Sequence, residues 1–196
     1  MTTIVTVLTD GFADWETALL NAVAHAFYGV ETRYATPDGG VVTSSGGMRV
    51  LGDLAIGQVD PQALDALIVC GGTAWQQPGA PDIGGIARSS AEAGKVVGAI
   101  CDGTLTLARA GLLNRVAHTS NAAGYLDGPG YSGTALYADV PHAVRSANIV
   151  TAPGTAPVIT SITCCMSSPS VASKRQAAWR ESMRDGSAGV VFIGAI

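Results

Sequence analysis

Charged residues are scarce in this sequence, and no part of it carries an excess of basic charge. Only 13% of the 196 residues are charged, and 15 acidic against 11 basic residues give a formal net charge of −4. Binding to nucleic acid needs a surface that neutralises phosphates, which scattered arginines and lysines do not provide. We therefore expect no nucleic-acid partner.

Long hydrophobic runs are also missing. The apolar run over residues 3–9 has no cationic region before it, and Asp10 and Gly11 end it well short of the roughly 20 residues that span a bilayer. The sequence therefore predicts no membrane partner and a cytoplasmic protein.

The four cysteines do not have the spacing of metal ligands. They are Cys70, Cys101, Cys164 and Cys165, and the adjacent pair is poorly placed for the geometry that a mutual disulfide needs. We expect free thiols, no metal and no cofactor.

What the sequence does contain is enough hydrophobic residues, 47% of the chain, for one domain with a sizeable core. Short apolar runs typical of strands alternate with segments of helical periodicity. The expected strands cover residues 3–9, 31–37, 64–72, 96–100 and 147–154, the expected helices cover 13–29, about 82–93 and the segment after Cys101, and a hairpin is expected over 41–56. Strands joined by helices form parallel sheets that are covered on both faces, so the pattern predicts a doubly wound α/β fold.

Three polar or glycine-rich segments follow strands of this predicted sheet. They are DGFADWE after the first strand, GGTAW after the strand ending near Cys70, and CDGT after residues 96–100. The carboxyl ends of parallel strands lie at one edge, where ligands bind, so the three segments should meet there. Cys101 stands on a strand-to-helix turn that Gly103 allows to be sharp, and the positive end of the next helix should lower the pKa of its thiol.

Together these motifs resemble the ThiJ/PfpI superfamily, also called class I glutamine-amidotransferase-like proteins, which includes the Parkinsonism-linked deglycase, isocyanide hydratases and intracellular proteases. The matching segments, over residues 3 to about 158, are DGFADWE, CGGT, GAICDGTLTLARAGLL, HTSN and VTAPGTAPV. The resemblance implies a flavodoxin-like fold, with Cys101 as a nucleophile and Glu16 as a carboxyl group that hydrogen-bonds its sulfur. It also implies that the backbone amides of Gly72 and Asp102 bind an oxyanion.

Two anions in a partly buried site repel each other, so Glu16 and Cys101 should share a single proton. We expect a Cys101 thiolate that accepts a hydrogen bond from protonated Glu16, which then donates its proton to an intermediate. The alternatives are that Cys101 is a small core residue and that Glu16 is an acid favoured by the helix dipole, as we expect for Asp14. For Cys70 we expect a packing role.

The histidines bear on the branch of the superfamily. Glutamine amidotransferases carry a downstream histidine–glutamate pair, and His142 has no such partner, which weakens a glutaminase assignment. The protease branch has histidine directly after the nucleophile, where this chain has Asp102, so proteolysis is also disfavoured. His118 and Asn121 are candidates for the substrate pocket, and a histidine satisfied by local polar groups is the alternative for His118.

These features predict a cysteine-dependent enzyme that hydrolyses or hydrates a small electrophilic or amide-like substrate. A competing hypothesis is a redox sensor or stress-protection protein in which Cys101 is oxidised, and a third is an inactive member used for binding. Relatives of this kind are commonly homodimers, and the extended edges over residues 41–54 offer a surface that a second subunit could cover.

Residues 159–196 break the pattern. The resemblance implies an amphipathic helix directly after VTAPGTAPV, but a Ser/Thr-rich stretch and Pro169 interrupt any helical stripe. We hypothesise a domain over residues 1–158 and a tail that descends from a frameshift or sequence error, with at most a short helix over about 173–183. The alternative is a buried helical turn over 158–166 and a final strand.

Overall fold

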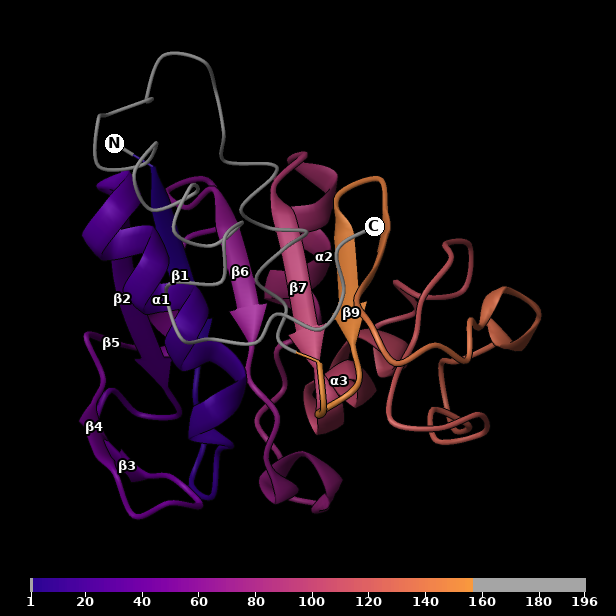
Figure 1. The fold of residues 1–196 in the computed structure, drawn as a ribbon, viewed down its shortest axis with the longest axis horizontal. Helices are drawn as coiled ribbons and strands as arrows, with labels where there is room; N and C mark the ends of the chain where they lie inside the picture. Colours follow the sequence, from indigo (N-terminus) through magenta and orange to yellow (C-terminus); the bar gives the residue numbers. More distant parts are fainter. Residues whose placement is uncertain (1, 157–196) are drawn as a thin grey trace, which may run out of the picture.

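The centre of the fold is a sheet of seven strands, in a computed structural model that describes residues 2–156 (Figure 1). The strand order is β5-β2-β1-β6-β7-β9-β8. All neighbouring strands are parallel except β8 and β9, which confirms the predicted, mainly parallel flavodoxin-like sheet. The bounds are β1 Thr3–Val7, β2 Glu31–Thr36, β5 Leu54–Ala55, β6 Ala66–Val69, β7 Val96–Ile100, β8 Val144–Ser146 and β9 Ile149–Ala152.

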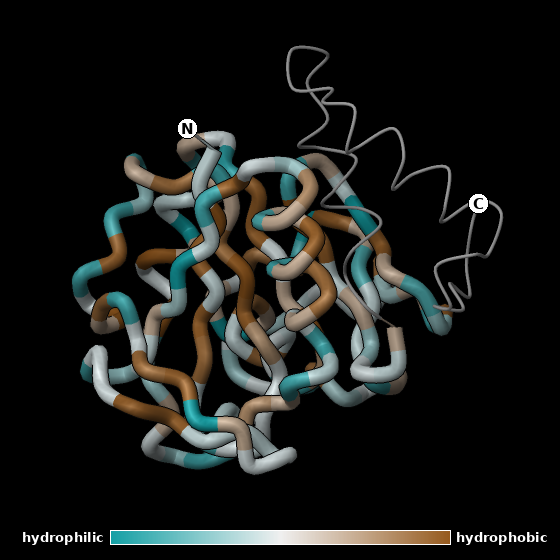
Figure 2. Tube along the Cα trace, turned by 60° about the vertical axis from the view of Figure 1, so that its left-hand side comes forward, coloured by the Kyte–Doolittle hydropathy of each residue, from teal (hydrophilic) through white to brown (hydrophobic). Residues whose placement is uncertain are grey.

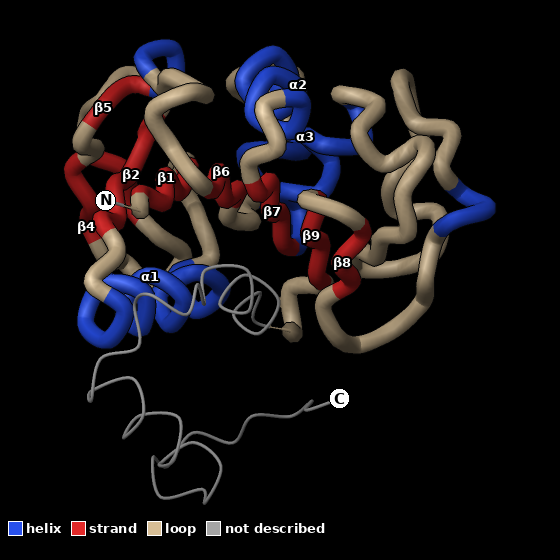
Figure 3. Tube along the Cα trace, turned by 90° about the horizontal axis from the view of Figure 1, so that it is seen from above, coloured by secondary structure: helices blue, strands red, loops and turns tan. Residues whose placement is uncertain are grey.

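Helices cover both faces of the sheet, as expected for parallel strands joined by crossovers (Figure 3). Helix α1 (Asp14–Tyr28) lies on one face, and α2 (Gly84–Glu92) and α3 (Thr104–Arg109) lie on the other. Gly29 ends α1 in the left-handed conformation, with a φ of 64°, which is the stop that its position predicts. Four short 3-10 turns complete the helical elements: η1 (Ile56–Gln58), η2 (Thr73–Gln76), η3 (Cys101–Gly103) and η4 (Thr134–Leu136).

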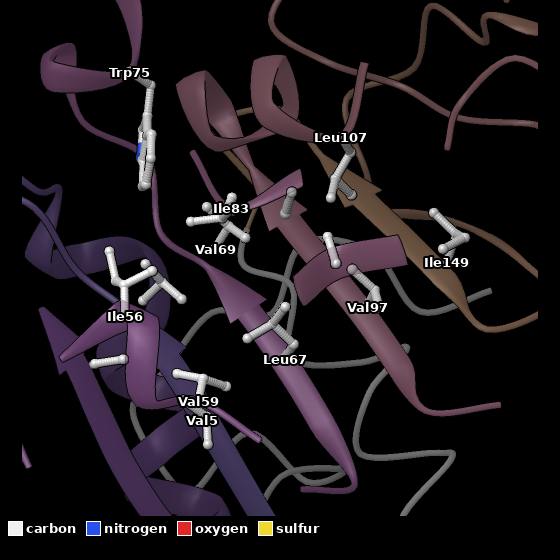
Figure 4. Packing of buried hydrophobic residues seen from close by; sticks show 14 of the residues in the cluster. Val5, Ile56, Val59, Leu67, Val69, Trp75, Ile83, Val97, Leu107 and Ile149 are labelled. Carbon is white, nitrogen blue, oxygen red and sulfur yellow. The ribbon is translucent and has the colours of Figure 1, made fainter. Parts of the chain in front are cut away.

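The core is divided by the sheet, because successive strand residues point to opposite faces. Figure 4 shows the side beneath α2 and α3, where Leu67, Val69 and Val97 pack with Trp75 and Leu107. On the other side, α1 covers a cluster that includes Ile4, Leu20, Ile68, Ile100 and Val150. Figure 2 shows the hydrophobic residues gathered in the inner strands and the hydrophilic residues around the outside. The strands whose ends carry the motifs are therefore held between two packed clusters of hydrophobic side chains.

The predicted hairpin is present beside the sheet. Strands β3 (Val41–Thr43) and β4 (Arg49–Leu51) pair antiparallel. Asp14, in the first turn of α1, accepts hydrogen bonds from the Ser44 hydroxyl at 2.5 Å and the Gly46 amide at 3.2 Å. Its carboxylate thus holds the hairpin against the start of α1.

Two predicted elements differ from the structure, and several expectations fall outside it. The helix after Cys101 ends at Arg109 and is followed by turns, and the last predicted strand is shortened to β9 with the antiparallel β8 before it. The boundary at residue 158, the proposed tail and its helix lie outside the described residues. None of the helices within residues 2–156 is both long and apolar enough to cross a bilayer.

Candidate active site

Cys101 occupies a sharp turn between β7 and α3. Its φ is 55°, a value that side chains other than glycine rarely adopt, and the 3-10 turn η3 begins at this residue. The turn packs directly on β6, because a Cβ atom at Gly103 would lie only 2.7 Å from the carbonyl oxygen of Val69. The neighbouring β6 and the missing side chain at Gly103 therefore allow the geometry that the sequence predicts for this cysteine.

Glu16 lies in the first turn of α1 and is almost completely buried, with 1% of its surface exposed. Its Oε2 accepts a hydrogen bond from the Gly71 amide at 2.7 Å, which fixes the carboxyl group against the end of β6. Its Oε1 has no hydrogen-bond partner among residues 2–156. A buried carboxyl oxygen without a partner is costly, and such a position is typical of a group that exchanges a proton.

Two glycines bring the Cys101 and Glu16 side chains into one small space. A Cβ atom at Gly154 would lie 2.8 Å from the Cys101 sulfur and 3.2 Å from Glu16 Oε1. A Cβ atom at Gly71 would lie 2.9 Å from the same oxygen and 2.7 Å from the Cys101 Cβ. The structure thus places the two predicted residues together, between the backbone segments at Gly71 and Gly154.

The pKa of Glu16 is raised from 4.5 to about 7, chiefly because burial penalises the carboxylate. The Gly71 amide and the neighbouring Cys101 thiol lower this pKa, but by less than burial raises it. At neutral pH the carboxyl group is therefore close to half protonated, which suits a group that both accepts and donates protons.

The expected lowering of the Cys101 pKa is wrong. Burial raises the pKa of the thiol to about 11; the Asn121 side chain opposes this rise and the negative charge of Glu16 adds to it. The helix that was expected to stabilise the thiolate has only six residues, and two carboxyl groups stand beside the sulfur. Burial therefore raises the pKa values of both Cys101 and Glu16, so both groups are protonated more readily than in water.

The Asn121 side chain donates a hydrogen bond from its Nδ2 to the Cys101 sulfur at 3.3 Å. Its Oδ1 accepts a hydrogen bond from the Gly154 amide at 3.0 Å, which orients the side-chain amide. The preceding Ser120 is held by a 2.7 Å hydrogen bond to Thr104, the residue that begins α3. The structure therefore brings Asn121, a predicted pocket residue, to the sulfur.

His118 is placed differently. It is fully buried, its Nδ1 lies 2.8 Å from the Val116 carbonyl oxygen, and its Nε2 lies 2.9 Å from the Tyr131 hydroxyl. The rings of Tyr131 and Tyr137 pack against it edge to face. Both ring nitrogens therefore have local polar partners. This is the second of the two roles expected for His118 from the sequence, rather than a position in the substrate pocket.

The two predicted oxyanion donors follow the adjacent parallel strands β6 and β7. Gly72 follows β6, and its amide donates no hydrogen bond within residues 2–156. The Asp102 amide lies close enough to the Cys101 sulfur to lower the pKa of the thiol. Both are backbone groups at strand ends, which is where such donors stand ready for an anion.

Comparison with known protein families shows which family this chain belongs to. A family model described as the DJ-1/PfpI family matches residues 2–161. The chain belongs to the DJ-1/PfpI family. The resemblance inferred from the motifs is thereby confirmed.

Individual members of the DJ-1/PfpI family are similar over most of the chain. The crystal structure of the DJ-1 superfamily protein Atu0886 from Agrobacterium tumefaciens superposes with a TM-score of 0.84 and 39% identity, covering 97% of this chain and 100% of that one. Two Bacillus subtilis proteins named as uncharacterized proteases are also similar. YdeA is 31% identical over 78% of this chain and 76% of its own length, and YoaZ is 34% identical over 60% and 57%.

The candidate site around Cys101 also contains a polar network that the sequence does not predict. The Asp102 carboxylate, 7% exposed, accepts hydrogen bonds from the Tyr125 hydroxyl, from Gln76 at 3.2 Å and from Asn121 at 3.5 Å. Burial and the Asp102 carboxylate raise the pKa of Tyr125, so its hydroxyl remains a donor. Tyr125 lies in a glycine-rich loop with no periodicity, and no pattern in the sequence indicates that it reaches Asp102.

Cys70 lies against Glu16, with its sulfur 3.9 Å from Glu16 Oε2. Its side chain is 1% exposed, its sulfur lies 3.3 Å from the Ala13 carbonyl oxygen, and burial raises its pKa to about 12. These surroundings agree with the predicted packing role. Within residues 2–156, no group of three or more histidine, cysteine, aspartate or glutamate side chains is arranged to hold a metal ion.

Proposed function

We propose that this protein is a cysteine-dependent enzyme that hydrolyses or hydrates a small electrophilic or amide-like substrate. The observation that carries the proposal is the buried Glu16 carboxyl group, whose unpartnered Oε1 shares one small space with the Cys101 sulfur. A nucleophile beside a group that can take its proton is the arrangement that covalent catalysis requires.

The first step follows from the two pKa values. The cycle starts from a Cys101 thiol, whose pKa burial raises, and a Glu16 carboxylate. Glu16 Oε1 takes the thiol proton as the sulfur forms a bond to the electrophilic carbon of the substrate. The amides of Gly72 and Asp102 then stabilise the negative charge that develops on the substrate heteroatom.

The remaining steps return the proton. For an amide, Glu16 passes its proton to the nitrogen as the carbon–nitrogen bond breaks, which leaves a thioester on Cys101. Water then adds to the thioester carbon while Glu16 accepts one of its protons, and the carbon–sulfur bond breaks. The departing sulfur recovers that proton, so the enzyme ends as it began. In a hydration the substrate keeps all its atoms: Glu16 gives its proton to the substrate, water adds to the carbon that carries the sulfur while Glu16 accepts one of its protons, and the carbon–sulfur bond then breaks as the sulfur recovers that proton.

The surroundings of the sulfur favour small substrates. Backbone at Gly71 and Gly154 approaches the reacting groups so closely that even a methyl group would collide with them. Trp15, 61% exposed, borders the same segment through a 3.2 Å hydrogen bond from its indole nitrogen to the Gly154 carbonyl oxygen. A polypeptide in extended conformation is a poor fit to such a space, and Asp102 stands where the protease branch has histidine.

The redox alternative is less well supported. Peroxide reacts with thiolates rather than thiols, and the raised pKa of Cys101 leaves little thiolate at neutral pH. A thiolate that forms only as a substrate approaches can take part in a catalytic cycle. It is not present in the resting protein, where a sensor would need it to react with peroxide.

The test is turnover of a panel of small amides, carbonyl compounds and isonitriles by the wild type, Cys101→Ser, Glu16→Gln and a control. The control is Glu92→Gln, the same change at an exposed position at the end of α2. We expect saturable turnover of at least one compound, its loss in Cys101→Ser, a decrease of kcat by about 100-fold or more in Glu16→Gln, and no change in the control. No turnover of any compound, together with peroxide-dependent modification of Cys101, would favour the sensor.

A further inference from the structure

A cavity separate from the Cys101 site opens on the face of the sheet that carries α2 and α3. Its volume is about 550 Å³, and neither Cys101 nor Glu16 lines it. This volume is within the range of small-molecule sites, roughly 300–1,000 Å³. The walls come from the segment after η2 and from the two helices, and the polar lining includes Gln76, Gln77, Asp82, Arg88, Thr106 and Arg109.

Two arginines enter this cavity from neighbouring helices, which lie together on one face (Figure 3). Arg88 on α2 donates from Nη1 to the Ala110 carbonyl oxygen at 3.3 Å. Arg109, the last residue of α3, donates from Nη1 to the Trp75 carbonyl oxygen at 2.8 Å. These bonds hold each guanidinium group in place while using only one of its five N–H donors.

Neither arginine is neutralised by a carboxylate. The ion pair found in residues 2–156 joins Lys95 to Asp65, away from the cavity. Asp82 is the acidic side chain of the lining, and its Oδ1 accepts a 2.8 Å hydrogen bond from the Gly84 amide at the start of α2. The cavity lining therefore carries two positively charged side chains and one negatively charged side chain that already accepts a hydrogen bond, whereas the chain as a whole has a net charge of −4.

We propose that this cavity binds a small phosphate monoester of about the size of a sugar phosphate, held by Arg88 and Arg109. Guanidinium groups bind phosphate oxygens through pairs of charge-assisted hydrogen bonds, and two of them match the charge of a phosphate dianion. The lining offers Gln77 and Asp82 to hydroxyl groups, and Pro78, Pro81 and Ile83 to a carbon skeleton.

The cavity shares a wall with the Cys101 turn. Arg109 binds the carbonyl group of Trp75, and the next residue, Gln76, donates to the Asp102 carboxylate at 3.2 Å. A ligand in the cavity would therefore lie on the reverse side of the segment that supports Asp102, without touching the sulfur.

Titration calorimetry of the full chain with glycerol 3-phosphate tests the proposal, with glycerol and glycerate as the neutral and carboxylate counterparts. We expect saturable binding of glycerol 3-phosphate, weaker binding of glycerate and none of glycerol. Arg88→Gln and Arg109→Gln should each weaken binding by about tenfold. Arg115→Gln, the same change at an exposed arginine outside the cavity, and Cys101→Ser should leave the affinity unchanged.

Four results would contradict the proposal. Absence of saturable binding to the wild type would overturn the proposal, as would an unchanged affinity in Arg88→Gln, which disturbs only one exposed side chain. Tighter binding of glycerate would overturn the assignment to phosphate. A loss of binding in Cys101→Ser would place the ligand at the cysteine site instead.

Discussion

Burial of the Glu16 carboxyl group links folding stability to pH. Its pKa is about 7 in the folded protein against 4.5 for an ordinary glutamate, so between these values the folded state binds more protons than the unfolded state. The stability that this group contributes is present below pH 4.5 and is lost as the pH rises through 7. The loss is at most about 3 kcal/mol, from 1.36 kcal/mol per pKa unit.

Glu16→Gln should remove this dependence. We expect urea denaturation between pH 4.5 and 8 to show the wild type losing stability relative to the variant, because glutamine keeps the carbonyl oxygen that the Gly71 amide needs but cannot ionise. Parallel stability curves for the two proteins would contradict the raised pKa.

The two described thiols should differ in reactivity for a reason that combines exposure and acidity. Cys101 is half-buried with a pKa raised to about 11, whereas Cys70 is 1% exposed with a pKa raised to about 12. We expect iodoacetamide to modify Cys101 first, as measured by peptide mass spectrometry, at a rate that still increases above pH 9 as more thiolate forms. Equal rates at both thiols would count against the site, and a plateau below pH 7 would restore the low thiol pKa that the sequence predicts.

At the residue scale, the proximity of Cys101 and Glu16 was predictable from the sequence, whereas the direction in which the pKa of the thiol shifts was not. Cys101 and Glu16 could be named because each follows a predicted strand within a specific motif. The pKa of the thiol depends on how far burial outweighs the hydrogen bond from Asn121, which is 20 residues away in the sequence.

At the scale of elements, the site depends on glycines that let backbone segments approach the reacting groups. Gly154→Ala would place a methyl group 2.8 Å from the Cys101 sulfur, a separation that forces the side chain aside. We expect a folded variant in which alkylation of Cys101 and any turnover fall by about tenfold or more, since displacement of a nucleophile by about 1 Å is costly.

Gly57→Ala is the matched control for that experiment. Gly57 lies in η1, and a Cβ atom there would meet nothing within 4 Å. Its alkylation rate should equal that of the wild type, and circular dichroism should show both variants folded. An unchanged rate in Gly154→Ala would mean that the loop after β9 does not confine the sulfur.

The elements themselves were largely predictable, with the boundaries as the weak point. The parallel strands and α1 follow from strong periodicity, and Gly29 marks the end of α1. The helix after Cys101 was predicted too long, because Leu112 and Leu113 continue its apolar spacing although Gly111, with a φ of 73°, has already turned the chain. Tertiary packing of Leu113 in the core, rather than helical continuation, accounts for the leucine.

For the whole molecule we expect a homodimer that uses the hairpin. Val41, Met48 and Leu51 are 46%, 47% and 68% exposed, and all three belong to β3, β4 or the turn between them. Light scattering across a concentration series should give twice the monomer mass. Leu51→Lys should shift the equilibrium towards monomer, and Leu136→Lys, at another exposed leucine, should not. A monomeric mass at all concentrations would contradict this expectation.

The sequence by itself determined the family, the order of strands and helices, and the edge of the sheet at which Cys101, Glu16 and Gly72 gather. These are consequences of local periodicity and of a rule that holds for all parallel sheets. Only the tertiary structure decided that burial raises the pKa of Cys101, that Asn121 and not His118 reaches its sulfur, that Tyr125 binds Asp102, and that Arg88 and Arg109 share a cavity. Each of these depends on the burial and distance between groups far apart in the chain, which periodicity does not encode.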